Sequence, residues 1–118
     1  MVRSLTAPEA ARLRQLKAEF FKSLAHPLRI HILERLRDGP VNVGRLQQAI
    51  GVPASSLSQQ LTFLRGRNIL SAERQGNVVF YAVTDPGVLQ LLDDARAILA
   101  AHVSEQADLL SSEASAAR

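Results

Sequence analysis

Several kinds of functional site are missing from this sequence because their residues are missing. The 118 residues include no cysteine, which excludes disulfides, thiolate metal sites and a cysteine nucleophile. No apolar run approaches the ~20 residues that span a bilayer, and the first residues lack the apolar core of a signal peptide. We therefore expect a cytoplasmic protein with no membrane partner.

The chain also lacks the usual signatures of an enzyme. It has no glycine-rich phosphate loop, no internal repeat and no carboxylates paired in a plausible cleft, since Asp93 and Asp94 are adjacent on an expected helix and point different ways. None of His26, His31 and His102 has an obvious nucleophile partner in the sequence. The alternative of a small enzyme would need a pocket of convergent titratable groups, so we do not expect catalysis.

Charge is distributed unevenly along the chain, whose formal net charge is +3. Residues 1–85 hold twelve Lys and Arg against six acids, giving +6, while residues 86–118 hold two against five, giving −3. A basic body suits the neutralisation of DNA phosphates, which releases counterions. Many proteins are mildly basic, however, so charge alone does not identify a nucleic-acid partner.

The stretch from Asn42 to Arg67 has the pattern of two short helices joined by a tight turn. The first helix ends at Gly51, and the second begins at Ser55 after a proline. Regularly spaced apolar residues predict one buried face on each helix: Leu46, Ala49 and Ile50 on the first, and Leu57, Leu61 and Leu64 on the second.

The outward face of the second helix is polar but nearly uncharged. It carries Ser55, Ser56, Ser58, Gln59 and Thr62. A solvated helix face usually carries Lys and Glu, whereas short hydroxyls and amides suit hydrogen bonds to base edges in a major groove. This is the layout of a helix-turn-helix, whose second helix reads DNA. The alternative is a helix-glycine-helix corner that binds nothing.

A β-hairpin is expected directly after this helix pair. Residues 68–72 lead into a first strand, Gln75-Gly76-Asn77 supplies the turn, and residues 78–83 form a strongly β-prone second strand. The polar residues at or next to the tip, which can reach a phosphate backbone or a minor groove, are Arg74, Gln75 and Asn77. The order helix, turn, polar helix and hairpin matches a winged helix. A plain hairpin that closes the core is the alternative.

Helices are also expected on both sides of this motif. A first helix begins after Thr6, which can form a capping box with Glu9, and a second helix covers Pro27 to Asp38. A last helix runs from Val88 to about Leu110, capped by Thr84 or Asp85.

The first and last helices carry broader apolar faces than one small core needs. We expect them to form a homodimer interface, although both stripes could instead be buried within one subunit. The predicted architecture is mainly α with a β-hairpin wing, in the order α-α-α-α-β-β-α. Residues 1–110 form a single winged helix-turn-helix domain with terminal dimerisation helices, followed by a disordered tail at residues 111–118.

Three segments in combination resemble the ArsR/SmtB repressors: FFKSLAHPLRIHILERL, SSLSQQLTFLR and RQGNVVFYAV. The similarity covers roughly residues 15–105. It implies a small dimeric winged-helix protein of bacteria that represses transcription by binding an operator and is released when an effector alters the dimer. The base-reading positions of that family fall here on Ala54, Ser55, Ser58 and Gln59. The residues expected at phosphates or in the wing are Ser56, Thr62, Arg65, Arg67, Arg74, Gln75 and Asn77.

The resemblance leaves the effector open. Many metal-sensing members use a Cys-x-Cys pair on the helix before the turn, where this chain has Asn42 and Gly44, so that thiolate site is lost. Other members bind metal between the last helices of two subunits, using D-x-H from one chain and H-x-x-E or H-x-x-H from its partner.

Here His102 and Glu105 match the second half of that interfacial site, while Leu89 and Leu91 stand where the first half belongs. Two ligands from each chain, meeting across a two-fold axis, would suit nickel, zinc or cobalt. The alternative is a solvated His-Glu pair without a ligand. A non-metal small molecule, a partner protein and no effector at all also remain open.

The predicted function is therefore that of a bacterial transcriptional repressor that binds an imperfect palindromic operator as a homodimer. The alternative is a winged-helix protein-protein interaction module without sequence-specific DNA binding. The two differ in salt dependence, because only a DNA binder loses affinity for a duplex in proportion to the phosphates it neutralises.

Overall fold

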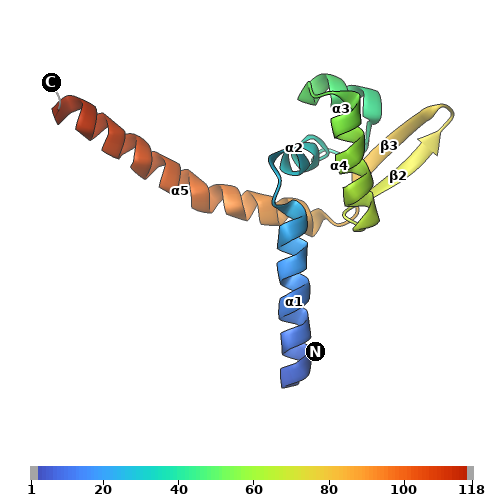
Figure 1. Cartoon of the computed structure of the whole chain (residues 1–118), viewed down its shortest axis with the longest axis horizontal. Helices are drawn as coiled ribbons and strands as arrows, with labels where there is room; N and C mark the ends of the chain where they lie inside the picture. Colours follow the sequence, from blue (N-terminus) through green and yellow to red (C-terminus); the bar gives the residue numbers. More distant parts are fainter. Residues whose placement is uncertain (1–2, 117–118) are drawn as a thin grey trace. The chain divides into compact units, whose positions relative to one another are not determined.

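The computed structural model describes residues 3–116 (Figure 1). The chain divides into two units, with the boundary between Thr84 and Asp85. The first unit contains α1 (Ala7–Leu24), α2 (Pro27–Arg35), β1 (Val41–Asn42), α3 (Val43–Ile50), α4 (Ala54–Gly66), β2 (Leu70–Gln75) and β3 (Val78–Val83), and the second contains α5 (Pro86–Ala116). The predicted order of helices and hairpin is confirmed. No helix within this described range is long and apolar enough to cross a membrane.

The ends of α1 and α2 follow from local hydrogen bonds. At the start of α1, the Thr6 hydroxyl accepts from the Glu9 backbone N–H at 3.3 Å and the Glu9 carboxylate accepts from the Thr6 N–H at 3.4 Å, which confirms the predicted capping box. Helix α2 ends at Arg35, earlier than predicted. Short-range turn bonds, including Gly39 N–H to the Leu36 carbonyl at 3.2 Å, take over there, and Gly39 adopts a φ of 127° that turns the chain.

The core of the first unit is built from aliphatic side chains of four helices and the start of β2. Its most deeply buried members are Ile32, Leu33, Leu46, Leu57, Leu61, Leu64 and Leu70. The three predicted inward leucines of α4 are among them. Ala49 was predicted to be buried but is exposed, because α3 packs against α2 and β3 along the row from Leu46 to Ile50 and leaves Ala49 to one side.

The sheet has the order β1-β3-β2, and both strand pairs are antiparallel. Strands β2 and β3 pair from Leu70 with Val83 to Gln75 with Val78, so only Gly76 and Asn77 form the turn. Gly76 occupies the first turn position with a φ of 64°. The favoured two-residue hairpin turns need a positive φ at this position, which glycine adopts without strain. Gln75, predicted in the turn, is the last residue of β2. The two-residue strand β1 was not predicted, because so short a segment has no detectable alternation.

Helix α5 is capped by Asp85, whose carboxylate accepts from the Gly87 N–H at 2.8 Å. Thr84, the other predicted cap, instead donates its hydroxyl to the Asn68 carbonyl at 2.6 Å. The helix continues to Ala116, past the end predicted near Leu110. Residues 111–116 contain alanine and glutamate and neither glycine nor proline, so nothing in them ends a helix. Residues 117–118 of the predicted tail lie outside the described residues.

Candidate nucleic-acid interface

The turn between α3 and α4 fixes how α4 is presented. Gly51 closes α3 in the left-handed conformation, with a φ of 78°, and its N–H donates to the Gln47 carbonyl at 2.8 Å. Pro53, with a φ of −56°, is the residue before α4, and its carbonyl accepts from the Leu57 N–H at 3.1 Å. Helix α4 therefore starts at Ala54, one residue before the predicted Ser55.

The two faces of α4 differ in burial and in chemistry. Leu57, Leu61 and Leu64 are at most 1% exposed, and the helix packs through them onto α2 and β2. The opposite face exposes Ala54, Ser55, Ser58, Gln59 and Thr62, as predicted, whereas Ser56 is half-buried. No Lys, Arg, Asp or Glu occurs from residue 54 to residue 64.

The polar side chains of this face have no competing partner in the chain. The side chains of Ser55, Ser58 and Gln59 make no hydrogen bond or ion pair with any residue whose side chain the structure describes. Their hydroxyl and amide groups are therefore available to an external partner. A hydroxyl or amide without a partner in the chain can hydrogen-bond to base edges. The Gln side chain can accept from and donate to the same adenine.

The first turn of α4 is also open to an anion. Its N-cap is Pro53, so no side chain caps the backbone N–H groups of the first turn. Such uncapped groups, with the positive end of the helix dipole, favour a phosphate. This uncapped helix start was not predicted from the sequence. The signal was present in Pro53, because a helix that follows proline directly has no capping hydroxyl or carboxylate.

The wing lies at the same end of the unit as the start of α4. Strand β2 begins beside the C-terminal end of α4, and the hairpin runs back toward the end at which α4 starts (Figure 1). Arg74, Gln75 and Asn77 are all exposed at or beside the tip. The structure thus brings the predicted wing residues and the predicted base-reading residues to one side of the unit.

Arg65 and Arg67 lie far from the base-reading end of α4. Both are exposed at the C-terminal end of α4, and this helix of 13 residues is about 20 Å long. The Arg67 guanidinium carbon lies 5.2 Å from the centre of the Phe63 ring. These two arginines are therefore separated from the first turn of α4 by almost the whole helix.

The candidate metal ligands lie on α5. His102 Nδ1 and Glu105 Oε2 are 4.0 Å apart, and both side chains are about three-quarters exposed. Within the described part of the chain, no group of three or more potential ligands comes together. The first of the two positions that would carry thiolates serves the fold instead, since the Asn42 side chain accepts from the Arg45 N–H at 2.9 Å and caps α3.

Known proteins with related sequences are transcriptional regulators. The chain is 44% identical over 103 residues to the uncharacterized HTH-type transcriptional regulator Rv0081 of Mycobacterium tuberculosis, which covers 86% of this chain and 90% of that protein. It is 38% identical over 90 residues to the HTH-type transcriptional regulator NmtR of the same species, covering 76% of this chain and 75% of NmtR. No protein-family model matches the chain.

Solved structures show the same architecture. The crystal structure of M. tuberculosis Rv0081 matches with a TM-score of 0.72 at 45% identity, covering 80% of this chain and 95% of that one. The transcriptional repressor BigR from Xylella fastidiosa matches with a TM-score of 0.70 at 32% identity, covering 80% and 96%. With its helix-turn-helix and wing, this chain belongs to the ArsR/SmtB family of winged helix-turn-helix transcriptional regulators.

Proposed function

We propose that this protein is a cytoplasmic bacterial repressor that binds an imperfect palindromic operator as a homodimer, with α4 in the major groove. Ala54, Ser55, Ser58 and Gln59 read the bases in this proposal. The observation that carries it is the exposed, uncharged polar face at the start of α4, whose side chains have no partner among the residues with described side chains. The protein-interaction alternative is less favoured, because it gives no role to the uncapped start of α4.

The backbone contacts follow from the same placement. We assign Arg74, Gln75 and Asn77 to the adjacent minor groove or its phosphates, because they lie at the wing tip. Ser56 and Thr62 flank the base-reading face and are assigned to phosphates. Arg65 and Arg67 can contact DNA only where the backbone passes the far end of α4, so we expect them to contribute less than Arg74.

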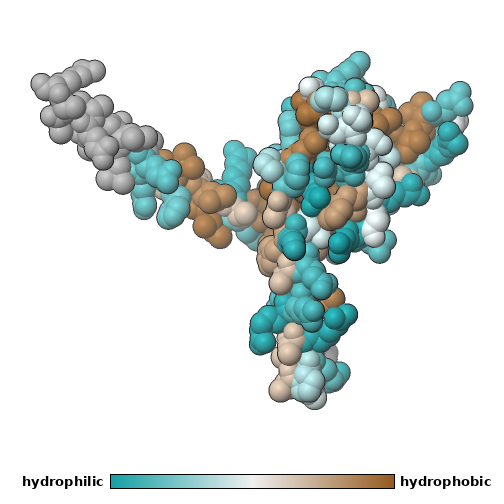
Figure 2. Space-filling view, in the orientation of Figure 1, coloured by the Kyte–Doolittle hydropathy of each residue, from teal (hydrophilic) through white to brown (hydrophobic). Residues whose placement is uncertain are grey.

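The homodimer is proposed from apolar surface on helices of both units. On α1, Leu13, Leu16 and Phe21 are 40–53% exposed. On α5, Ile98, Leu99 and Val103 are 56–72% exposed, and Figure 2 shows hydrophobic side chains along the described part of this helix. Solvent-exposed apolar faces of this kind mark protein interfaces, and a two-fold dimer would present two copies of α4 to consecutive major grooves.

DNA binding is tested by fluorescence anisotropy on the duplex upstream of the protein's own gene and on a shuffled duplex of equal length. We expect the upstream duplex to bind about 10³-fold or more tightly than the shuffled one, as specific repressors do. Equal affinity for both duplexes over a range of salt concentrations would contradict a sequence-specific repressor and support a different partner.

A divalent metal ion is the candidate effector for which the chain carries ligands. His102 and Glu105 lie one turn apart on α5 and supply two ligands per chain, so a four-coordinate site for nickel, zinc or cobalt needs the same pair from the partner subunit. A small molecule or a partner protein that binds elsewhere is the alternative effector.

The metal assignment predicts a change in operator affinity. In the same anisotropy assay, adding nickel or zinc after a chelator should weaken operator binding about 5- to 150-fold, the usual range of allosteric coupling. The His102→Ala variant should lose this response and keep its metal-free affinity. An unchanged operator affinity in the presence of metal would exclude a metal effector at α5.

A further inference from the structure

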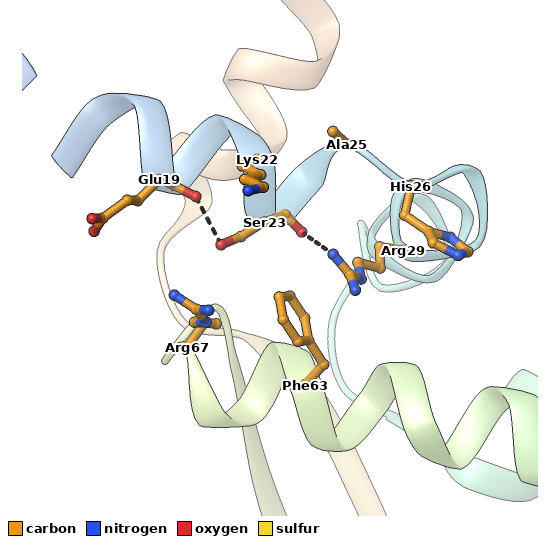
Figure 3. Close-up of a pocket in the computed structure, with 8 residues that line it drawn as sticks. All are labelled: Glu19, Lys22, Ser23, Ala25, His26, Arg29, Phe63 and Arg67. Carbon is orange, nitrogen blue, oxygen red and sulfur yellow. Dashed lines mark hydrogen bonds between the residues drawn. The ribbon is translucent and has the colours of Figure 1, made fainter. Parts of the chain in front are cut away.

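A pocket of about 770 Å³ opens on the first unit, away from the start of α4. It lies between the C-terminal part of α1, the junction of α1 with α2, and the C-terminal half of α4 (Figure 3). Pockets that hold small organic ligands are typically 300–1,000 Å³, so this one is far larger than an inorganic ion requires. Of its lining residues, only Arg67 has a place in the DNA-binding proposal.

A fixed arginine on an aromatic ring forms one wall. The Arg29 guanidinium carbon lies 3.6 Å from the centre of the Phe63 ring. Its Nε donates to the Gln60 side-chain oxygen at 2.8 Å, and its Nη1 donates to the Ser23 carbonyl at 3.3 Å. These bonds orient the guanidinium and use two of its five N–H groups, which leaves donors for a ligand.

The charged groups around the pocket are mainly positive. Lys22, Arg29 and Arg67 contribute three positive charges against the single negative charge of Glu19. In Figure 3, Arg29 and Arg67 lie on either side of the Phe63 ring, while the Glu19 carboxylate points away from it. Such a set of cations attracts an anion, and a guanidinium pairs best with a planar carboxylate.

Of the other polar groups of the pocket, His26 favours an anion and Ser23 does not. The Ser23 hydroxyl donates to the Glu19 carbonyl at 3.0 Å, so it offers a ligand only its lone pairs. His26 Nδ1 accepts from the Leu28 N–H at 3.1 Å, which leaves Nε2 as the protonated nitrogen and therefore as a hydrogen-bond donor. Because the two arginines lie on either side of the Phe63 ring, the ring offers a ligand its edge as an apolar surface.

We propose that this pocket binds a small organic anion with a planar apolar part, such as an aromatic carboxylate. The carboxylate pairs with Lys22 and the arginines, and the planar part lies against Phe63. Because the pocket joins α1 to α4, an occupied pocket would also influence how α4 meets DNA. That consequence rests on the proposed function, whereas binding itself does not.

The binding claim is tested without DNA, by titrating the ¹⁵N-labelled full-length protein with sodium benzoate at constant ionic strength. We expect saturable shifts of backbone amides in residues 19–29 and 63–67, with a dissociation constant on the order of 1 mM for so small a probe. Benzamidine has nearly the same shape with the opposite charge and should cause no such shifts. Equal shifts from both probes, or shifts that do not saturate, would overturn the proposal.

Two further probes separate the sources of negative charge. Inorganic phosphate should bind more weakly than benzoate, because it has no apolar part to lie against Phe63. Binding of equal strength would remove the planar part of the proposal. A short random duplex should change the dissociation constant of benzoate only up to a limit that saturating duplex reaches, as coupling between two separate sites requires. A dissociation constant that rises in proportion to the duplex concentration would identify the pocket as a contact to the DNA backbone and contradict a small-molecule site.

Pocket variants give a second, independent measurement. Lys22→Gln, at an exposed position, should retain the fold and weaken benzoate about 2- to 5-fold. Phe63→Leu keeps an apolar side chain and should weaken it about 2- to 10-fold. The matched control is Lys17→Gln, which removes the same charge from α1 outside the pocket and should leave the dissociation constant unchanged. Equal effects of Lys22→Gln and Lys17→Gln would overturn the assignment.

Discussion

Leu61→Ala should lower the free energy of unfolding by about 2–5 kcal/mol, the largest effect we expect from a single substitution. Leu61 is 1% exposed and lies between Leu57 and Leu64 on the face of α4 that packs against α2 and β2. Alanine is the best helix former, so the loss would come from the cavity and the missing contacts and not from the helix itself. Urea unfolding followed by circular dichroism, at one fixed protein concentration, measures it.

The matched control for this prediction is Leu61→Met, which nearly conserves the side-chain volume and should cost less than about 1.5 kcal/mol. A similar loss for both variants would mean that shape and not volume decides the packing here. If neither variant changed the unfolding midpoint, α4 would not be held by this face and its polar face would have no defined orientation.

Gln59→Ala should weaken binding to the operator by about 1–3 kcal/mol, on the scale of one lost base contact. Gln59 is exposed on the first two turns of α4, and its amide has no partner among the described residues. Because glutamine reads bases and carries no charge, the loss should appear for the operator and not for a shuffled duplex. Fluorescence anisotropy on both duplexes separates the two effects.

The control for Gln59 is Gln15→Ala, which removes the same amide from an exposed position on α1. Its operator affinity should match that of the unmodified protein. Equal weakening of operator and shuffled duplex by Gln59→Ala would assign this side chain to the backbone. An unchanged affinity for both would remove Gln59 from the base-reading set.

The elements that could be predicted from the sequence are those with local causes. Gly51 stops α3, Gly76 makes the hairpin turn, and the capping box at Thr6 starts α1, so these boundaries required only neighbouring residues. The leucine spacing of α4 likewise separated its buried face from its polar face. The end of α5 was predicted near Leu110, which is too early. The serines and alanines that follow include no residue type that ends a helix.

The features that could not be predicted depend on distant residues. Arg29 and Gln60 are 31 positions apart in the sequence, and nothing in the periodicity of either helix indicates that they bond beside Phe63. Strand β1 exists only because β3 lies alongside it. The separation of Arg65 and Arg67 from the wing tip likewise depends on the direction of the hairpin, which leads away from the C-terminal end of α4 (Figure 1).

The most direct test of the central claim is a hydroxyl-radical footprint of the protein on the DNA upstream of its own gene. Two copies of α4 in consecutive major grooves predict two protected half-sites whose centres are about 10–10.5 base pairs apart, on one face of the duplex. The footprint should fade as salt is raised. Uniform protection along the duplex, or a single protected half-site, would contradict a dimer that reads an operator with two recognition helices.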